Sequence, residues 1–320
     1  RLEGLEPDAV ERALWDERSL VKTWAMRGTL HLLPADELGL WQAGLSTYRH
    51  YLRPVWFRSF GITPEQLEAL IEAVTDVLDG AALTREELAA AVAERTGAPE
   101  LGEKLRESWG AFLKPAAFRG RLCFAPSDGQ KVRFTRPDSW LGHAIERPDP
   151  DDAMREIARR YLAAHGPATR EDLRRWWATS PAAAGRLLKA LDDAVEVDVD
   201  GTAMWMLSAH AREAAAAPPP TGVRLVPAFD QYVVAATRQA EPLMPGPFRD
   251  RVYRPQGWLS AVLLVGGRMD GVWRHERKGR RIEIALDPFG RMGKAVRAEA
   301  EAEAERLAEF LDGEPAIKWA

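Results

Sequence analysis

Hydrophobic and polar positions follow the same order twice in the first two thirds of the chain. The stretch Gly80–Leu88, with the sequence GAALTREEL, reappears as Gly166–Leu173 with the sequence GPATREDL. Apolar residues recur at three- and four-residue spacing before each copy, which predicts amphipathic helices over Pro64–Leu78 and Asp152–Ala164. Each predicted helix is followed by the first glycine of the repeat, a residue typical of helix C-termini.

Both copies continue with matching elements. Thr84 and Thr169 are each followed three residues later by an acid, the capping-box pattern that starts a second helix. A third helix and a two-stranded hairpin come next, and Asp200-Gly201 is a strong hairpin turn signal in the second copy. The predicted third helices and strands are Leu101–Phe118, Arg121–Ala125 and Lys131–Thr135 in the first copy, and Pro181–Asp192, Ala194–Val199 and Thr202–Leu207 in the second. Three helices and a wing are the plan of a winged helix-turn-helix, which binds DNA in many proteins and serves for protein docking in others.

The start of the chain predicts a partial unit of the same kind. A helix is expected over Pro7–Glu17, a strand over Ser19–Leu33 and a helix from Pro34 to Leu45. Strict alternation in the strand places Arg27, Thr29 and His31 on one face, with Thr23 and Ala25. The opposite face holds Trp24, Met26, Gly28, Leu30 and Leu32. The first face therefore presents a cation, a hydroxyl and an imidazole in a row.

The last third of the chain has a different composition. A proline-rich linker over Ala214–Thr221 precedes a predicted strand over Val223–Ala228, and a final helix is expected over Met292–Leu311. Between them, a meander is predicted from Trp258–Val265, Arg268–His275 and Arg280–Leu286. The expected fold class is α+β, mainly α, with tandem winged helix-turn-helix repeats and a β-rich C-terminal part. The expected domains are residues 1–60, 61–148, 149–213 and 222–320.

Composition excludes several protein classes. Of the 320 residues, 46% are hydrophobic and 29% are charged, which argues against a disordered chain. The single cysteine, Cys123, cannot form an internal disulfide, which fits a reducing cytoplasm. The longest apolar run, Leu259–Val265, is too short to span a bilayer. The six histidines lack metal-ligand spacing and no phosphate-binding glycine loop occurs, so we expect no metal and no cofactor.

Basic residues gather in two segments although the formal net charge is −4. Residues 103–136 hold eight lysines or arginines against three acids, and residues 249–281 hold nine against three. Such surface is compatible with nucleic-acid contact and also occurs on solvated faces. The DNA contacts predicted on third helices, wings and the C-terminal hairpin are Lys104, Arg106, Arg121, Lys131, Arg133, Arg186, Lys189, Arg274, Arg277 and Lys278.

Two features of the sequence affect which of these predicted DNA contacts we expect. The second wing carries Glu196, Asp198 and Asp200, which phosphate would repel, so the two copies are not expected to read DNA equally. The basic C-terminal hairpin either enters a groove of DNA or protects a sheet edge by its charge.

Three separated segments resemble the AlkZ-like family of bacterial DNA glycosylases. They are Thr23–Pro34 (TWAMRGTLHLLP), Leu225–Tyr232 (LVPAFDQY) and Tyr253–Ser260 (YRPQGWLS). The resemblance covers nearly the whole chain. It implies a C-shaped array of three tandem winged helices with a β-rich C-terminal part, which holds duplex DNA and excises alkylated bases, including those in interstrand crosslinks.

The family's catalytic signature, Gln-x-Gln or Gln-x-Asp, precedes the position that corresponds to Arg1, and no two glutamines here have that spacing. Because the sequence lacks an initial methionine, we expect an N-terminal segment to be missing. Arg27, Thr29 and His31 are then expected to line the floor of the DNA channel. His31 and Asp230 are the candidate catalytic residues, although Asp230 equally fits a helix N-cap.

Three hypotheses follow. The first is a monomeric, cytoplasmic glycosylase that acts on double-stranded DNA. The second is a noncatalytic winged-helix DNA-binding or regulatory protein. The third is a protein-docking scaffold.

Overall fold

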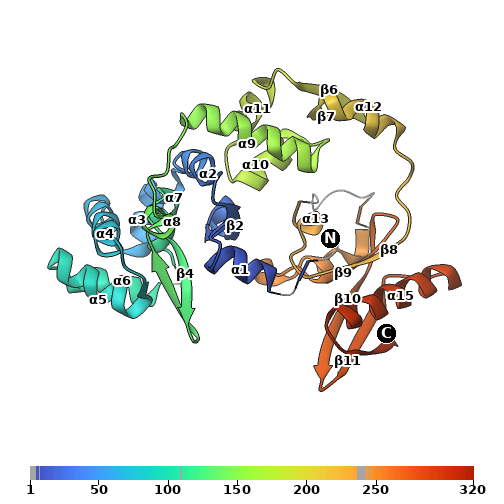
Figure 1. The fold of residues 1–320 in the computed structure, drawn as a ribbon. Coiled ribbons are helices and arrows are strands. Elements are labelled where there is room, and N and C mark those ends of the chain that lie inside the picture. The colour runs from blue at the N-terminus through green and yellow to red at the C-terminus, as the bar shows by residue number, and fades with distance from the viewer. Residues whose placement is uncertain (1–4, 7, 109, 236–242, 245) are drawn as a thin grey trace. The chain divides into compact units, whose positions relative to one another are not determined.

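The computed structural model describes residues 5–6, 8–108, 110–235, 243–244 and 246–320. The chain divides into two compact units, Arg1–Ser208 and Ala209–Ala320, and both contain helices and strands (Figure 1). The predicted division of the first unit into three domains stays a prediction.

The N-terminal unit is mostly helical. Its helices are α1 (Ala9–Trp15), α2 (Leu38–Leu45), α3 (Pro54–Phe60), α4 (Pro64–Val77), α5 (Arg85–Thr96), α6 (Pro99–Glu107), α7 (Leu113–Phe118), α8 (Pro137–Leu141), α9 (Pro150–His165), α10 (Arg170–Trp177) and α11 (Pro181–Lys189), with short 3-10 turns η1 (Met26–Gly28) and η2 (His50–Leu52). Its strands are β1 (Leu20–Trp24), β2 (Leu30–Pro34), β3 (Leu83–Thr84), β4 (Cys123–Asp128), β5 (Lys131–Thr135), β6 (Ala194–Val199) and β7 (Thr202–Leu207).

The repeat forms equivalent local structures in both copies. Thr84 and Thr169 each close a capping box, in which the threonine hydroxyl accepts from the backbone N–H three residues later and the acid side chain bonds back. Both predicted hairpins are confirmed, β4 with β5 and β6 with β7. The second pairs Val199 with Thr202 across the predicted Asp200-Gly201 turn.

The predicted third helix of the first copy is wrong in one respect, because it consists of two helices, α6 and α7. Ser108 is extended, and Gly110 has a φ of +82°, a conformation that favours glycine. The Cβ of an alanine at Gly110 would lie 3.0 Å from Cζ2 of Trp24. The break therefore lets the Trp24 ring approach the backbone.

The predicted strand over Ser19–Leu33 is also wrong, because the segment folds back on itself. β1 and β2 pair antiparallel, with Thr23 opposite His31. Arg27 and Gly28 have φ values of +60° and +68°, and the Ala25 N–H donates to the Thr29 carbonyl at 2.9 Å. The alternating pattern was compatible with one long strand, but these two left-handed residues make a tight turn at its centre.

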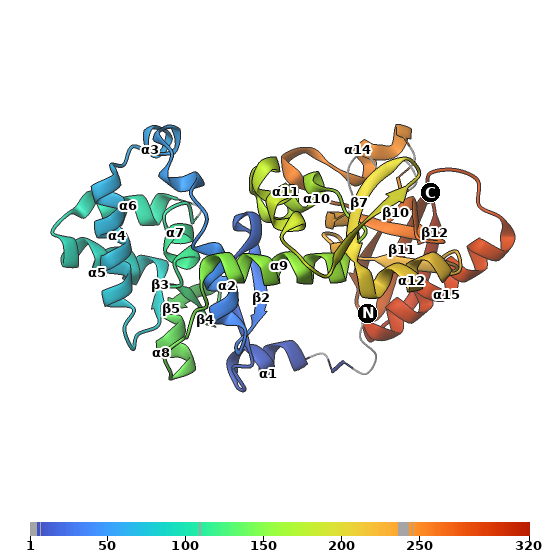
Figure 2. The same cartoon turned by 90° about the horizontal axis from the view of Figure 1, so that it is seen from above.

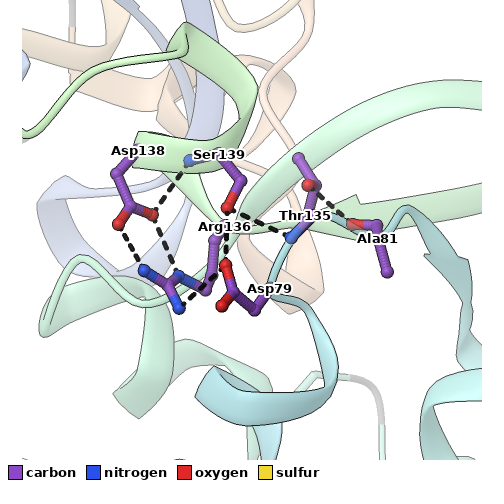
Figure 3. Close-up of polar contacts among 7 residues, drawn as sticks. Asp79, Ala81, Thr135, Arg136, Asp138 and Ser139 are labelled. Atoms are coloured by element: carbon purple, nitrogen blue, oxygen red, sulfur yellow. Dashed lines mark hydrogen bonds and ion pairs between the residues drawn. The ribbon is translucent and has the colours of Figure 1, made fainter.

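A polar network joins the end of the first wing to the turn after α4 (Figure 3). The Thr135 hydroxyl donates to the Ala81 carbonyl at 2.8 Å, and the Ser139 hydroxyl donates to Asp79 at 3.3 Å. Arg136 forms ion pairs with Asp79 and Asp138. These contacts hold the wing against the helices of the same copy.

Two hydrophobic clusters organise the N-terminal unit. One spans the β1–β2 hairpin, α2, α4, α5, α7 and the first wing, and the other lies among α9, α10, α11 and β7. Figures 1 and 2 show α9 beside α2, which pack together directly. The close approach needs Gly44, since a Cβ there would lie 2.4 Å from Cδ1 of Ile157.

The C-terminal unit is built on a five-stranded sheet in the order β12-β11-β10-β9-β8. Its elements are α12 (Ser208–Ala216), β8 (Val223–Val226), α13 (Gln231–Ala235), η3 (Gly246–Phe248), α14 (Arg249–Val252), η4 (Pro255–Gly257), β9 (Ala261–Val265), β10 (Arg268–Lys278), β11 (Arg281–Pro288), α15 (Lys294–Phe310) and β12 (Glu314–Trp319). The predicted meander is confirmed, with Gly266-Gly267 at its first turn.

The helices of the C-terminal unit belong to two separate hydrophobic clusters. Ala300, Ala304 and Ala308 form a buried stripe on α15 against the strands, whereas Val233 of α13 and Val252 of α14 belong to a second cluster. The structure also corrects two predictions. α12 extends into the expected linker as far as Ala216, and the unpredicted strand β12 pairs parallel to β11.

We expect opposite effects from alanine at two helical glycines. Gly44→Ala should lower the stability of the N-terminal unit by about 1–3 kcal/mol, because the new methyl group overpacks the α2–α9 contact. Gly185→Ala, where the nearest atom is the Arg170 Cδ at 3.8 Å, should raise it by about 0.5–1 kcal/mol. Differential scanning calorimetry of both variants measures the changes. Equal shifts in the same direction would contradict the tight α2–α9 packing.

Candidate nucleic-acid interface

The turn between β1 and β2 brings Arg27, Thr29 and His31 together. The Thr29 hydroxyl donates to the Met26 carbonyl at 2.9 Å and lies 2.9 Å from Nε2 of His31. Thr29 is exposed, and Arg27 and His31 are partly buried. The three side chains that were predicted to act together therefore lie close to one another. They do so on the β1–β2 turn and the first residues of β2, and not along one face of a single long strand.

Arg27 connects this turn to the C-terminus of α10. Its Nη1 donates to the Trp176 carbonyl at 2.7 Å, and its backbone N–H donates to the Tyr48 hydroxyl at 3.1 Å. The Tyr48 hydroxyl donates in turn to the Trp177 carbonyl at 2.5 Å. A cation and a hydroxyl thus satisfy carbonyls that the helix end leaves unpaired.

Burial determines the protonation of this region. It raises the pKa of Tyr48 to about 12, so the hydroxyl keeps its proton at neutral pH. The pKa of His31 is lowered, first by burial and then by the charge of Arg27. The pKa of His165, at the end of α9, is lowered by the same two causes. These two imidazoles are therefore neutral at pH 7 and can accept a hydrogen bond.

A cavity of about 290 Å³ adjoins the turn through Tyr48. Its lining residues are Thr47, Tyr48, Arg49, His50, Arg53, Trp177, Ala178, Thr179 and Ser180. The pKa of His50 is lowered by burial, then by Arg53 and Lys114. Because the lining has two arginines and none of its described residues is acidic, its potential favours an anion such as a phosphate group.

The predicted contacts of the first copy have different environments. On α6, Lys104 donates to the Phe60 carbonyl at 3.1 Å, and Arg106 is exposed. On the wing, Lys131 is exposed, whereas Arg133 donates through Nε to the Pro126 carbonyl at 2.7 Å. Arg121 is exposed and lines a second cavity.

That second cavity, of about 450 Å³, is not purely basic. Its lining includes Glu68, Glu72 and Asp76 beside Arg121, and Glu68 forms an ion pair with Arg119. The carboxylates make it a weaker candidate for phosphate than the cavity at Tyr48.

In the second copy, Arg186 and Lys189 are exposed on α11. The Glu196, Asp198 and Asp200 side chains of its wing are exposed as well. The acidic wing is thus a surface feature and not a buried network.

In the C-terminal unit, the β10–β11 hairpin exposes Arg274, Arg277 and Lys278. Lys278 forms ion pairs with Glu276 and Glu283, at 3.4 and 3.1 Å. Arg277 donates to carbonyls at the end of α15, including that of Leu311. Part of the positive charge that the sequence predicted is therefore compensated by neighbouring carboxylates.

Asp230 lies in the loop between β8 and α13 and is buried. Its Oδ1 accepts from the Tyr232 N–H at 2.8 Å. This is the helix-capping geometry that the sequence offered as the alternative to catalysis. A catalytic role of Asp230 stays a prediction.

Sequence reasoning missed Tyr48, His50 and His165. Tyr48 and His50 have one local signal, the polar-aromatic run Tyr48–Tyr51 (YRHY), whereas their contacts with Trp177 and Phe118 join residues far apart along the chain. Within the described ranges, no group of three or more His, Cys, Asp or Glu side chains is arranged to hold a metal ion. Nor does any described helix combine the length and apolarity needed to cross a membrane.

Comparisons with known proteins give one consistent result. Residues 1–310 match a family model described as DNA glycosylase AlkZ-like. An interstrand DNA cross-link repair glycosylase from Streptomyces sahachiroi is 39% identical over 287 residues, which cover 88% of this chain and 76% of that protein. The solved structure of the Streptomyces sahachiroi DNA glycosylase AlkZ matches with a TM-score of 0.88 and 36% identity, covering 98% of this chain and 85% of that one.

We expect His31 to titrate with a pKa below the ordinary value of about 6.5. Histidine-labelled protein followed by NMR across pH 4–9 measures it. In Arg27→Gln the pKa of His31 should rise only part of the way, because burial remains when the charge is removed.

The lowered pKa of His31 also predicts how the stability of the folded protein changes with pH. A histidine with a lowered folded-state pKa contributes stability that is present above about pH 6.5 and is lost as the pH falls through the folded-state pKa. His31→Gln should therefore flatten the fall in melting temperature on acidification. An unchanged profile would mean that His31 is as well solvated in the folded state as in the unfolded state.

Proposed function

This chain belongs to the AlkZ-like DNA glycosylase family, and we propose from that membership that it hydrolyses N-glycosidic bonds of alkylated or crosslinked bases in DNA. The observation that carries the proposal is the match over residues 1–310, together with a glycosylase relative that is 39% identical. The basic cavity beside the Arg27 turn supports it, because DNA presents phosphate groups along its whole length.

The reaction class sets what the site must supply. Cleavage of an N-glycosidic bond develops positive charge on the sugar, which polar or anionic groups stabilise while they position a water molecule. Alkylation gives the base a positive charge, so it leaves without strong general-acid assistance. The main tasks of the protein are therefore to stabilise the positive charge on the sugar and to position the water molecule.

Arg27, Thr29 and His31 are proposed to line the floor of the DNA-binding surface. The neutral imidazole of His31 can accept a hydrogen bond from water, and the exposed Thr29 hydroxyl lies beside it. Arg27 uses one amino group on the Trp176 carbonyl and retains further donors for a phosphate oxygen. Asp230 is the remaining proposed catalytic carboxylate.

We propose in addition that α4–β5 and α9–β7 are winged helix-turn-helix units. The matching capping boxes and hairpins support this, since the elements follow in the same order in both copies. The proposed DNA contacts on them are the seven cations Lys104, Arg106, Arg121, Lys131, Arg133, Arg186 and Lys189. We further propose a monomer that acts in the cytoplasm without metal or organic cofactor.

The second candidate is a noncatalytic winged-helix DNA-binding protein. It is supported by the matching capping boxes and hairpins of the two copies, since units of this plan bind DNA without catalysis in many proteins. Both candidates require DNA binding that weakens as salt rises, which a protein-docking scaffold would not show.

We expect protein from the complete reading frame to release alkylated bases from a methylated duplex and to unhook an interstrand crosslink, measured as abasic product on a gel. His31→Ala should slow release about tenfold or more, in the range seen for positioned acid–base groups, while the melting temperature changes little. His143→Ala, an exposed histidine, is the matched control. Salt-dependent binding without any base release would favour the noncatalytic protein.

Removal of the hairpin charges should weaken DNA binding generally. In Arg277→Ala/Lys278→Ala we expect lower affinity for duplexes of every sequence and a slope of log affinity against log salt that is shallower by about one to two. Fluorescence anisotropy at several salt concentrations measures both quantities. Arg291→Ala/Lys294→Ala removes the same charge from two exposed positions, one just before α15 and one at its first residue, and should change the slope less. Equal effects would mean that the hairpin acts only through net charge.

A further inference from the structure

Two segments of the C-terminal unit place exposed aromatic rings side by side. Phe229 follows β8, and Trp258 follows η4, and their ring centroids are 5.4 Å apart. Phe229 is 45% exposed and Trp258 is 59% exposed. Large aromatic rings are usually placed where they remove apolar area from water, so an exposed pair indicates a surface that contacts something else.

The loop that carries Trp258 is closed by backbone hydrogen bonds. Arg254 N–H donates to the Trp258 carbonyl at 2.8 Å, and Trp258 N–H donates to the Pro255 carbonyl at 3.4 Å. A bridge between Tyr253 and Leu259 closes the base of the loop. Leu259 and Tyr253 are buried, so the base of the loop is anchored, and the neighbouring Trp258 side chain is exposed.

Backbone strain accompanies both rings. Phe229 has a φ of +59°, and Gln256, two residues before Trp258, has the same value. The left-handed region is unfavourable for an L-residue that carries a Cβ. Asp230 holds the Phe229 loop in place through its hydrogen bond to the Tyr232 N–H. Such strain persists only where the surrounding structure enforces it, and it occurs often at binding sites.

The charge near the pair fits an anionic partner. Residues 249–258 contain three arginines and one aspartate. Arg251 is paired with Asp287, but no ion pair to a described residue is formed by Arg249 or Arg254, and both are exposed. Exposed aromatic rings and exposed arginines in one segment are the features that bind bases and phosphates of nucleic acids.

We propose that Phe229 and Trp258 form a stacking wedge that packs against a nucleobase next to an extruded nucleotide in duplex DNA. The inference rests on the proposed glycosylase function. For an alkylated base that is not crosslinked to the other strand, extrusion from the stack exposes the N-glycosidic bond and costs stacking energy. An aromatic pair that fills the gap recovers part of that energy, and Arg254 holds the adjacent phosphate.

The test compares two duplexes of identical sequence, one intact and one with a stable tetrahydrofuran abasic site. Wild-type protein should bind the abasic duplex more tightly, because the gap is already open. Trp258→Ala and Phe229→Ala should each weaken binding to it by about tenfold, the order expected for one lost base stack, and weaken binding to the intact duplex less. The slope of affinity against salt should stay unchanged, whereas Arg254→Ala should make it shallower by about one.

Two controls separate stacking from a structural role. Phe310→Ala removes an aromatic ring that is 66% exposed on α15 of the same unit and should leave both affinities unchanged. Trp258→Phe should restore most of the affinity, because a phenyl ring still stacks. Melting temperatures of all variants, measured in parallel, show whether the loop still folds.

The outcomes distinguish the two proposals. If wild-type protein releases alkylated bases but Trp258→Ala and Phe229→Ala bind the abasic duplex as the wild type does, the wedge is wrong and the glycosylase function stands. A loss of affinity that is equal on both duplexes, or that Trp258→Phe fails to restore, would also overturn the wedge. If wild-type protein neither binds duplex DNA nor releases bases, the proposed function and the wedge fail together.

Discussion

The contact of Arg27 and Tyr48 with the end of α10 connects distant parts of the N-terminal unit. Arg27 lies in the β1–β2 turn and Tyr48 follows α2, yet both side chains bond carbonyls of consecutive residues, Trp176 and Trp177. Trp177 is almost fully buried in the first hydrophobic cluster, which joins the second copy of the repeat to the start of the chain. Truncation of either partner would leave buried polar groups without a hydrogen bond, at a cost of about 1–3 kcal/mol each. The same contact positions the turn that carries Thr29 and His31, so stability and the candidate site depend on it together.

Pairing of charges matters more for this protein than their number. Residues 249–281 hold nine lysines or arginines and residues 103–136 hold eight, but on the C-terminal hairpin Lys278 and Arg281 share Glu283, and Arg280 lies near Glu314. At the cavity beside Tyr48, Arg49 donates to the Ser46 carbonyl, and the described lining contains no carboxylate. A phosphate group meets little competition there, whereas at the hairpin it must displace or share existing partners.

Strained backbone occurs in the Arg27 turn and in the two loops that carry the exposed aromatic pair. The Arg27 turn and the Phe229 and Trp258 loops all contain residues with left-handed φ values that are not glycine. Each belongs to one of the three segments by which the sequence resembles its family, and each loop is held by hydrogen bonds to buried neighbours. The family segments thus coincide with backbone that is costly to form, which is expected where function and not stability selects the conformation.

The sequence by itself determined the features that depend on near neighbours along the chain. The capping boxes at Thr84 and Thr169 and the hairpin at Asp200-Gly201 follow from hydrogen bonds across about three residues, so local pattern was sufficient to predict them. Alternation along Ser19–Leu33 predicted Arg27, Thr29 and His31 as candidate site residues, and this role stays a prediction. Only the tertiary structure decided the turn at Arg27, the break between α6 and α7 and the parallel strand β12. It also decided which side chains surround the site, because Tyr48, His165 and the two tryptophans of α10 meet there through packing between residues far apart in sequence. Such packing overrides local alternation and helical periodicity, which describe a segment alone and not the surface against which it folds.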